Sequence, residues 1–477
     1  MTFQNKKFPL HIFRAYDIRG KLSDLSPELV HAIASGLVVQ YQQAGQTQIA
    51  IGYDARLNSP QYAEIIKQVF EQNGLVVTML GCCSTPVLYF IARQFGGNGI
   101  MLTASHNPKT DNGIKWIIQS EPPCPELIQQ VALLASQQFQ SLSPLNVPLI
   151  EHDIVVKYCL EYQDALLHDI QLKRPFKVVL DGLNGSAGRC AALVFSKLNC
   201  QLTSIRCEAN GHFPDHAPDP SQEKHLLKLK QTVIEQHADV GIALDGDGDR
   251  LVLIDEKGNI ISADRLLSFF SALCLKTHPA HEVVFDVKCS SMVAKTVRNL
   301  GGQAKMIRTG SSFLRTYMAQ SNGRAVFGGE YAGHYVFNDG RGFGYDDGLY
   351  AALRVLEYLS QQPDLTLSQA LDAYPERYCT EDLYISTHSE EPHAVLRDVE
   401  MKSHAFGAQL TKIDGVRLDF EDGFGIIRAS NTGEYFTVRF DADNPVKLND
   451  IRDTFVSMLS DRYPKIAQDI LNVPNIQ

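Results

Sequence analysis

The sequence has 477 residues, and at about 150 residues per domain this length predicts about three domains. Hydrophobic residues make up 44% of the chain and charged residues 21%, which is typical of globular proteins with sizeable cores. The 44 basic and 54 acidic residues give a net charge of −10, which argues against a nucleic-acid-binding protein because phosphate backbones require a basic surface. An anionic substrate would therefore need basic residues concentrated at its site.

The cysteines and the apolar segments predict a cytoplasmic protein. The ten cysteines lack metal-ligand spacing apart from the adjacent pair Cys82–Cys83, so reduced thiols are expected. The segment MTFQNKKFPLHIFRAYDIRG lacks the apolar core of a signal peptide, and no stretch approaches the ~20 apolar residues of a membrane span. We expect a monomer whose partners are small molecules, with no nucleic acid and no membrane.

A weak repeat occurs three times along the chain. Each copy opens with a short apolar run that ends in aspartate, at Asp54, Asp181 and Asp286. Short β-branched runs that alternate with helical patterns are typical of buried parallel strands, so we expect three consecutive α/β domains with mixed sheets of similar topology. In the first copy, Ser59 is expected to be the N-cap of a helix that Pro60 opens.

The last hundred or so residues have a different pattern. VRLDF, GFGIIRAS and EYFTVRF read as strands of hairpins, and KLNDIRDTFVSMLSDRY reads as an amphipathic helix. This pattern predicts a smaller C-terminal α+β domain. The predicted domains are 1–150, 151–258, 259–370 and 371–477.

The third strand of each repeat is followed by a different set of polar residues. Ser105 and His106 follow it in the first copy, three aspartates in the second, and Glu330 with His334 in the third. Open α/β sheets bind ligands beyond the carboxyl ends of their strands. The three strand ends therefore predict one central cleft assembled from three domains.

The three aspartates, Asp245, Asp247 and Asp249, alternate with glycines and can direct their carboxylates at one hard cation. Their mutual repulsion favours a metal over a solvated acidic turn, which stays an alternative. An EF-hand is a poor match, because Arg250 stands where that loop needs glycine and the next residues read as a strand. Mg²⁺ is the expected ion, since it binds through few carboxylates plus substrate phosphate.

The loop Thr103-Ala104-Ser105-His106-Asn107-Pro108 is a candidate catalytic loop. Pro108 biases Asn107 toward an extended conformation, which favours a tight, exposed loop after the strand. Ser105 would be the nucleophile, with His106 and Lys115 as cations or proton carriers. The alternative is an ordinary polar turn of the same composition.

Two further segments carry groups suited to sugar or phosphate. Glu330 is suited to accept hydrogen bonds from sugar hydroxyls, but it could equally cap a helix or pair with a lysine. The segment from Arg428 to Glu434, RASNTGE, supplies many donors to a phosphate, with an ordinary hairpin turn as the alternative.

Taken together, these segments resemble the α-D-phosphohexomutase superfamily, and within it the bacterial phosphomannomutase/phosphoglucomutase group. The resemblance covers essentially the whole chain. The matching motifs, in order, are FRAYDIRG, TASHNP with NGIK, DGDGDR, FDVKCSS, GEYAGH, GFGYDDGLY and RASNTGEY.

The resemblance implies a mutase that interconverts hexose 1-phosphate and hexose 6-phosphate, with glucose or mannose 1,6-bisphosphate as intermediate and activator. It implies that Ser105 carries the phosphoryl group and binds Mg²⁺ together with Asp245, Asp247 and Asp249. Arg19, His106 and Lys115 match groups that assist proton transfer or positioning. The residues that match substrate contacts are Tyr16, Arg250, Lys288, Ser311, Glu330, His334, Arg428, Ser430, Asn431 and Thr432.

Two departures from the group's pattern concern the sugar. Ala332 replaces a serine that is common in the sugar loop, and Ser311 replaces a histidine that touches substrate. Both leave the choice between glucose and mannose open. Phosphoglucosamine mutase, a phosphatase and a non-catalytic sugar-phosphate-binding regulator stay as alternative readings.

Overall fold

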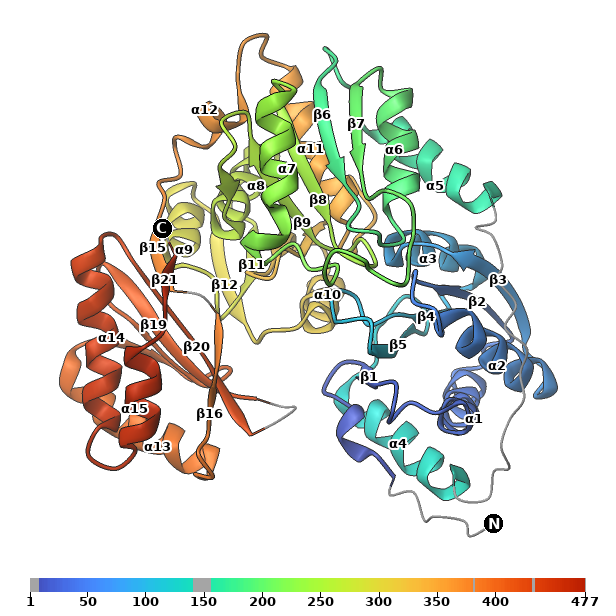
Figure 1. The fold of residues 1–477 in the computed structure, drawn as a ribbon, viewed down its shortest axis with the longest axis horizontal. Helices are drawn as coiled ribbons and strands as arrows, with labels where there is room; N and C mark the ends of the chain where they lie inside the picture. The colour runs from blue at the N-terminus through green and yellow to red at the C-terminus, as the bar shows by residue number, and fades with distance from the viewer. Residues whose placement is uncertain (1–7, 140–155, 381, 431–433, 477) are drawn as a thin grey trace. The chain divides into compact units, whose positions relative to one another are not determined.

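The computed structural model describes residues 8–139, 156–380, 382–430 and 434–476. The chain forms two compact units, one made of Met1–Ile261 and Ala332–Ala370, the other of Ser262–Tyr331 and Leu371–Gln477. Figure 1 shows the elements of each unit along the chain. Each unit is described by itself.

The first unit begins with a five-stranded mixed sheet in the order β1-β5-β4-β2-β3. Strands β2, β3 and β4 are parallel, whereas β5 is antiparallel to β4 and to β1. The strands are β1 (Ile18–Lys21), β2 (Gln48–Tyr53), β3 (Val76–Cys82), β4 (Gly99–Leu102) and β5 (Asp111–Ile117). The helices are α1 (Pro27–Gln43), α2 (Ser59–Gln72), α3 (Thr85–Ala92) and α4 (Pro125–Phe139), with 3-10 turns η1 (Leu10–Ile12) and η2 (Arg93–Phe95).

A second mixed sheet of the same unit repeats this arrangement in the order β10-β9-β8-β6-β7. Its strands are β6 (Lys177–Asp181), β7 (Gln201–Ile205), β8 (Val240–Leu244), β9 (Leu251–Asp255) and β10 (Ile260–Ile261). The other elements are α5 (Val156–Asp169), α6 (Gly188–Lys197), α7 (Glu223–Glu235), β14 (Tyr335–Phe337) and α11 (Gly348–Ser360). Helix α11 packs on β8 and β9 although it comes about a hundred residues later in the chain.

The second unit contains a third parallel set of strands, in which β11 lies between β12 and β13. The strands are β11 (Glu282–Asp286), β12 (Gln303–Ile307) and β13 (Ala325–Gly329). The helices are α8 (Ala263–Thr277), α9 (Ser291–Asn299) and α10 (Ser311–Gln320). A further short helix, α12 (Leu367–Leu371), spans the boundary between the units.

The C-terminal part of the second unit is an antiparallel sheet in the order β17-β18-β19-β20-β15-β21, with β16 also paired to β20. Its strands are β15 (Tyr378–Thr380), β16 (Leu383–Ser386), β17 (Gln409–Thr411), β18 (Val416–Asp419), β19 (Gly423–Ala429), β20 (Tyr435–Ala442) and β21 (Asn475–Ile476). The helices α13 (Pro392–Ser403), α14 (Pro445–Leu459) and α15 (Pro464–Leu471) lie along one face of it, with the turn η3 (His404–Phe406) (Figure 1). The predicted hairpins and amphipathic helix are confirmed.

The three α/β parts and the C-terminal α+β part confirm the predicted fold class. The strands that precede the candidate residues, β4, β8 and β13, are buried along their whole length, as expected for parallel strands covered on both faces. Among the described residues, no helix is both long enough and apolar enough to cross a membrane. The four predicted domain ranges stay predictions.

The helix starts are largely encoded locally, with one correction. Ser26, Ser84 and Ser262 each cap a helix by accepting a hydrogen bond from a backbone N–H of the first turn. Ser59 was predicted to do the same, but it is the first residue of α2 and its hydroxyl donates instead to Asp54 Oδ1. The buried carboxylate at the end of β2 takes this hydroxyl because it needs hydrogen-bond donors.

Candidate active site

Ser105 lies three residues beyond β4, and its hydroxyl faces the acidic loop, residues 245–250, that follows β8. Ser105 Oγ donates a hydrogen bond of 2.5 Å to Oδ2 of Asp245, and His106 Nδ1 lies 3.2 Å from the same Oγ. The φ angle of Ser105 is 50°, a left-handed conformation that costs a non-glycine residue about 1–2 kcal/mol. Because Ser105 is only 2% exposed, the prediction of an exposed loop is wrong at this residue.

Arg56 holds this loop in place, and the sequence analysis missed it. Its guanidinium donates hydrogen bonds of 2.7–2.9 Å to four backbone carbonyls, those of Ser105, Asn107 and Pro108 in the loop and of Asp111 at the start of β5. Nε of Arg56 donates to Asp54 Oδ2 at 3.0 Å, so the buried cation has a carboxylate partner. The available signal was an arginine two residues after the strand-end aspartate in GYDAR.

The three aspartates after β8 are buried and meet at one point. One ligand oxygen from each lies within 4.8 Å of the others. Asp247 and Asp249 each accept a hydrogen bond of 2.8 Å from Lys115 Nζ through Oδ2. Their Oδ1 atoms are buried and have no hydrogen-bond partner within the described ranges. Two orphaned carboxylate oxygens beside a third carboxylate fit a hard divalent cation.

Burial and charge set the protonation of this cluster in opposite directions. Burial, reinforced by the negative charges of Asp249 and Asp247, raises the pKa of Asp245 well above its usual range. Burial would also raise the pKa of Asp247, but the Lys115 ammonium outweighs it and holds that pKa below its ordinary value. The two carboxylates raise the pKa of Lys115 well above its usual value against burial, so this lysine is a fixed cation here.

Glycines allow the two loops to approach closely. A Cβ added at Gly246 would lie 2.4 Å from the carbonyl oxygen of Ser105, which is closer than any carbon can approach. Gly248 has a φ of 78°, which only glycine adopts without strain. The alternating glycines therefore bring the acidic loop against the Ser105 loop, and the predicted meeting of Ser105 with the aspartates is confirmed.

Arg19 and His106 lie beside Ser105, as predicted. Arg19 lies on β1, and it donates hydrogen bonds of 2.6 Å to Asp17 and 3.3 Å to Asn107 Oδ1 in the Ser105 loop. Burial and then the positive charge of Arg250 lower the pKa of His106 well below its usual value, so its imidazole is neutral. Tyr16 is half-buried in the segment before β1. The guanidinium of Arg19 and the neutral imidazole of His106 therefore both lie close to Ser105.

Arg250 and His334 form a second contact on the acidic loop. The backbone N–H of Arg250 donates to Asp245 Oδ1 at 3.2 Å, and its Nε donates to His334 Nε2 at 3.0 Å. His334 belongs to the first unit and contacts the acidic loop through Arg250. This contact was not predicted.

In the second unit, the two basic residues predicted to contact substrate each have a carboxylate partner. Lys288 Nζ donates a hydrogen bond of 2.5 Å to Asp382 Oδ2, and Arg428 donates one of 2.7 Å to Asp414 Oδ2. Asp414 Oδ2 also accepts from the backbone N–H of Thr309 at 3.2 Å. An anionic ligand of these cations would compete with protein carboxylates.

Glu330 follows β13, as predicted. Its Oε1 accepts a hydrogen bond of 2.6 Å from the backbone N–H of Gly310, the N-cap residue of α10. Glu330 Oε1 therefore binds at the start of a helix, which is the helix-capping alternative given for this residue. Ser311, the first residue of α10, is half-buried and directly follows Gly310 in the sequence.

Known proteins match the chain over nearly its whole length. Models of the phosphoglucomutase/phosphomannomutase α/β/α domains I, II and III match residues 10–133, 160–258 and 262–378. A phosphoglucomutase of Neisseria meningitidis serogroup A is 36% identical over 452 residues, 94% of this chain and 96% of that protein. A phosphomannomutase/phosphoglucomutase of Pseudomonas syringae pv. tomato is 35% identical and covers 97% of both chains.

The chain belongs to the phosphoglucomutase/phosphomannomutase family. A solved structure of a family protein from Burkholderia thailandensis matches with a TM-score of 0.85 and 29% identity, over 98% of this chain and 100% of that one. The order of α/β parts seen here is therefore the order of the family's domains.

Not every predicted residue of this family member can be placed. Asn431 and Thr432 lie outside the described residues. Ser430 is half-buried and directly follows β19, and its backbone N–H donates to the carbonyl of Tyr435 at 2.9 Å. The roles assigned to the substrate-binding residues stay predictions.

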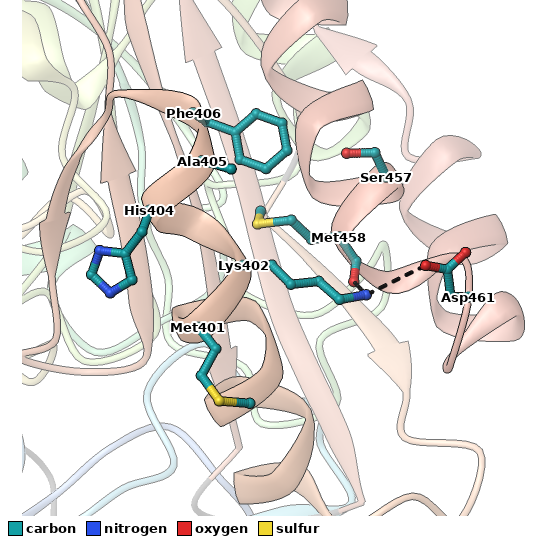
Figure 2. Close-up of a pocket in the computed structure, with 8 residues that line it drawn as sticks. All are labelled: Met401, Lys402, His404, Ala405, Phe406, Ser457, Met458 and Asp461. Atoms are coloured by element: carbon teal, nitrogen blue, oxygen red, sulfur yellow. Dashed lines mark hydrogen bonds and ion pairs between the residues drawn. The ribbon is translucent and has the colours of Figure 1, made fainter.

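A surface pocket in the C-terminal part of this mutase-family chain carries different chemistry. Figure 2 shows its lining, and none of the predicted site residues is among them. Lys402 Nζ donates to the carbonyl of Met458 at 2.7 Å and lies 3.8 Å from Asp461 (Figure 2). The lining consists of two methionines, a phenylalanine and an alanine together with Lys402, His404, Ser457 and Asp461, and it includes neither Ser105 nor the three aspartates of the acidic loop.

Proposed function

We propose that this protein is a phosphohexomutase that moves a phosphoryl group between C1 and C6 of a hexose phosphate. The observation that carries the proposal is the 2.5 Å hydrogen bond from Ser105 Oγ to Asp245 Oδ2. It brings a hydroxyl that can carry a phosphoryl group to a cluster of carboxylates that can bind a metal. Relatives named for phosphoglucomutase and phosphomannomutase activity support glucose and mannose phosphates as the substrates.

Mg²⁺ is the proposed metal, held by Asp245, Asp247, Asp249 and the phosphorylated Ser105. When bound, it would neutralise charge on the phosphoryl oxygens during transfer. The two orphaned Oδ1 atoms support this assignment. Lys115, which already bridges Asp247 and Asp249, adds a fixed positive charge at the same place.

In the proposed reaction, the free hydroxyl of the sugar phosphate attacks the phosphorus of phosphoserine, and the bond from phosphorus to Ser105 Oγ breaks. The sugar hydroxyl loses its proton and the serine oxygen gains one. His106, which is neutral and lies 3.2 Å from Ser105 Oγ, and Arg19 are placed to assist this exchange. The product is a hexose 1,6-bisphosphate, which must turn over so that its other phosphate returns to Ser105.

The remaining predicted residues would bind the substrate. Arg428, Ser430, Asn431 and Thr432 would grip the phosphate that is not being transferred, through charge and hydroxyl or amide donors. Glu330 and His334 would contact the sugar hydroxyls. The other proposed substrate contacts are Tyr16, Arg250, Lys288 and Ser311.

The test is a coupled assay with glucose 1-phosphate and a trace of glucose 1,6-bisphosphate. Wild-type protein should form glucose 6-phosphate, and Ser105→Ala should abolish turnover while sugar-phosphate binding remains measurable. Ser271→Ala is the matched control, because it removes a buried hydroxyl of α8 that donates only to a backbone carbonyl. Wild-type-like turnover in Ser105→Ala would refute the proposal.

The same assay separates the alternatives. Release of inorganic phosphate equal to substrate consumption would identify a phosphatase, and binding without turnover in wild-type protein would identify a regulator. Comparing kcat/KM for glucose, mannose and glucosamine phosphates would decide the preferred sugar.

A further inference from the structure

We propose that Asp346 is a positioning residue that fixes the orientation and the tautomer of His334, and through His334 the direction of the Arg250 guanidinium. The inference rests on the proposed function, in which His334 and Arg250 contact the substrate. Asp346 stands in the segment GFGYDDGLY, which has no role assigned so far.

The backbone places Asp346 and His334 on one face of a short antiparallel ladder. His334 pairs with Arg250, and Val336, two residues further along, pairs with Asp346. Residues that are directly opposite, and residues two apart on one strand, project to the same face. The side chains of Asp346 and His334 are therefore diagonal neighbours, at a distance that a carboxylate and an imidazole can bridge.

Backbone hydrogen bonds join both strands of this ladder to the acidic loop and to the strand that follows it. The backbone N–H of Leu251 donates to the carbonyl of Gly333 at 3.1 Å, and the N–H of Gly348 donates to the carbonyl of Gly248 at 3.2 Å. A Cβ at Gly348 would lie 2.4 Å from the carbonyl oxygen of Arg250. The segment that carries Asp346 thus packs directly against the backbone of the acidic loop at two points, Gly248 and Arg250.

Three side chains are joined by two successive contacts. Asp346 Oδ2 lies 2.9 Å from His334 Nδ1, and Arg250 Nε donates to His334 Nε2 at 3.0 Å. Asp346 is 1% exposed and His334 is 5% exposed, so water does not compete for these positions. Asp249 Oδ1 lies 3.6 Å from the same Nδ1, beyond hydrogen-bonding distance, and so Asp346 is the nearer carboxylate.

This geometry determines where the imidazole proton lies. An arginine Nε–H is a donor in every protonation state, so His334 Nε2 must present its lone pair to Arg250. When the ring is neutral its proton is therefore on Nδ1, 2.9 Å from Asp346 Oδ2, where the carboxylate attracts the N–H electrostatically although the two groups are not aligned as a hydrogen bond. A carboxylate this close to one ring nitrogen favours the tautomer that carries the proton on that nitrogen, as outer carboxylates do for metal-bound histidines.

Asp346→Asn tests the proposal, with Asp347→Asn as the matched control. The control carboxylate is the next residue and is 2% exposed, but it caps α11 by accepting from the backbone N–H of Tyr350 and does not contact His334. Asparagine is also a good N-cap, so the control keeps the helix start. The full chain is used in each case, labelled with ¹⁵N-histidine, and the His334 signal is identified by its loss in His334→Gln.

We expect the His334 signals of wild type and Asp347→Asn to report a proton on Nδ1, and those of Asp346→Asn to report a shift of the proton toward Nε2. We expect Asp346→Asn to lower kcat/KM by about 10–100-fold, the loss typical of removing an outer carboxylate. In a His334→Gln background, the same change should alter kcat/KM by less than about twofold, because the partner is already absent.

An unchanged His334 tautomer in Asp346→Asn overturns the proposal, as does an equal loss of kcat/KM with and without His334. The tautomer comparison requires no turnover. If wild-type protein lacked mutase activity, the proposed function would fail, while the spectra would still decide whether Asp346 positions His334.

Discussion

The residues around Ser105 in the first unit and the basic residues of the second unit differ in how their charges are balanced. Around Ser105, three buried carboxylates face Lys115, and two of their oxygens have no hydrogen-bond partner in the described part of the chain. In the second unit, Lys288 and Arg428 each already bind a carboxylate, Asp382 and Asp414.

The difference shows what each region requires from a ligand. The acidic loop has an excess of negative charge, so a cation that enters relieves repulsion as well as forming new bonds. The basic residues are neutralised within the protein, so a phosphate must displace a carboxylate and gains less than it would from a free cation. Metal binding should therefore have larger consequences than any single phosphate contact.

Removing the metal gives the largest expected effect. Dialysis against EDTA should lower kcat by about a thousand-fold or more, because a bound cation contributes several kcal/mol to charge neutralisation in the transition state. Added Mg²⁺ should restore the rate and raise the thermal midpoint of unfolding, since it binds only the folded loop. Full activity after chelation would show that the carboxylates have a structural role only.

Arg428→Ala, which changes the second unit, should have a smaller effect than removal of the metal. Loss of a charge-assisted contact to phosphate, worth about 1.5–3 kcal/mol, should raise KM by about 10–100-fold. We expect kcat to change less, and steady-state kinetics with glucose 1-phosphate would show the difference. Unchanged KM and kcat would mean that this loop does not bind phosphate.

The acidic loop should also couple metal binding to pH. The raised pKa of Asp245 means that this carboxyl keeps its proton to a higher pH than an ordinary aspartate when the metal is absent. Mg²⁺ must displace that proton, so the apparent affinity should rise with pH, by at most about tenfold per unit, and level off above the raised pKa. Calorimetry in buffers of different ionisation enthalpy should detect the released proton in wild type and not in Asp245→Asn.

Asp414→Asn should produce the smallest effect and the opposite sign to Arg428→Ala. Without its carboxylate partner, Arg428 no longer has to exchange one anion for another when phosphate binds. We expect KM to fall by about two- to fivefold, a change of up to about 1 kcal/mol. A rise in KM instead would show that Asp414 orients the guanidinium, and that the pairing in the second unit aids phosphate binding.

The sequence predicted the positions of the candidate residues at the strand ends well, because each set of residues follows its strand within a few positions. Asp54, Asp181 and Asp286 end their strands or follow them directly, and Ser105 meets Asp245 as expected. The prediction that Ser105 lies in an exposed loop was wrong. The loop is held in place by Arg56, whose four carbonyl contacts lie about fifty residues away in the chain.

The sequence by itself determined the repeated α/β pattern, the C-terminal hairpins and the position of each candidate residue after its strand. These features follow from local periodicity, strand length and turn residues, which the neighbouring amino acids encode. Only the tertiary structure decided which side chains pair, such as Asp346 with His334, Asp414 with Arg428, and Ser59 with Asp54 instead of its own helix. Such pairings depend on strand register and on the close approach of distant loops, and a buried charge takes whichever partner that geometry brings within reach.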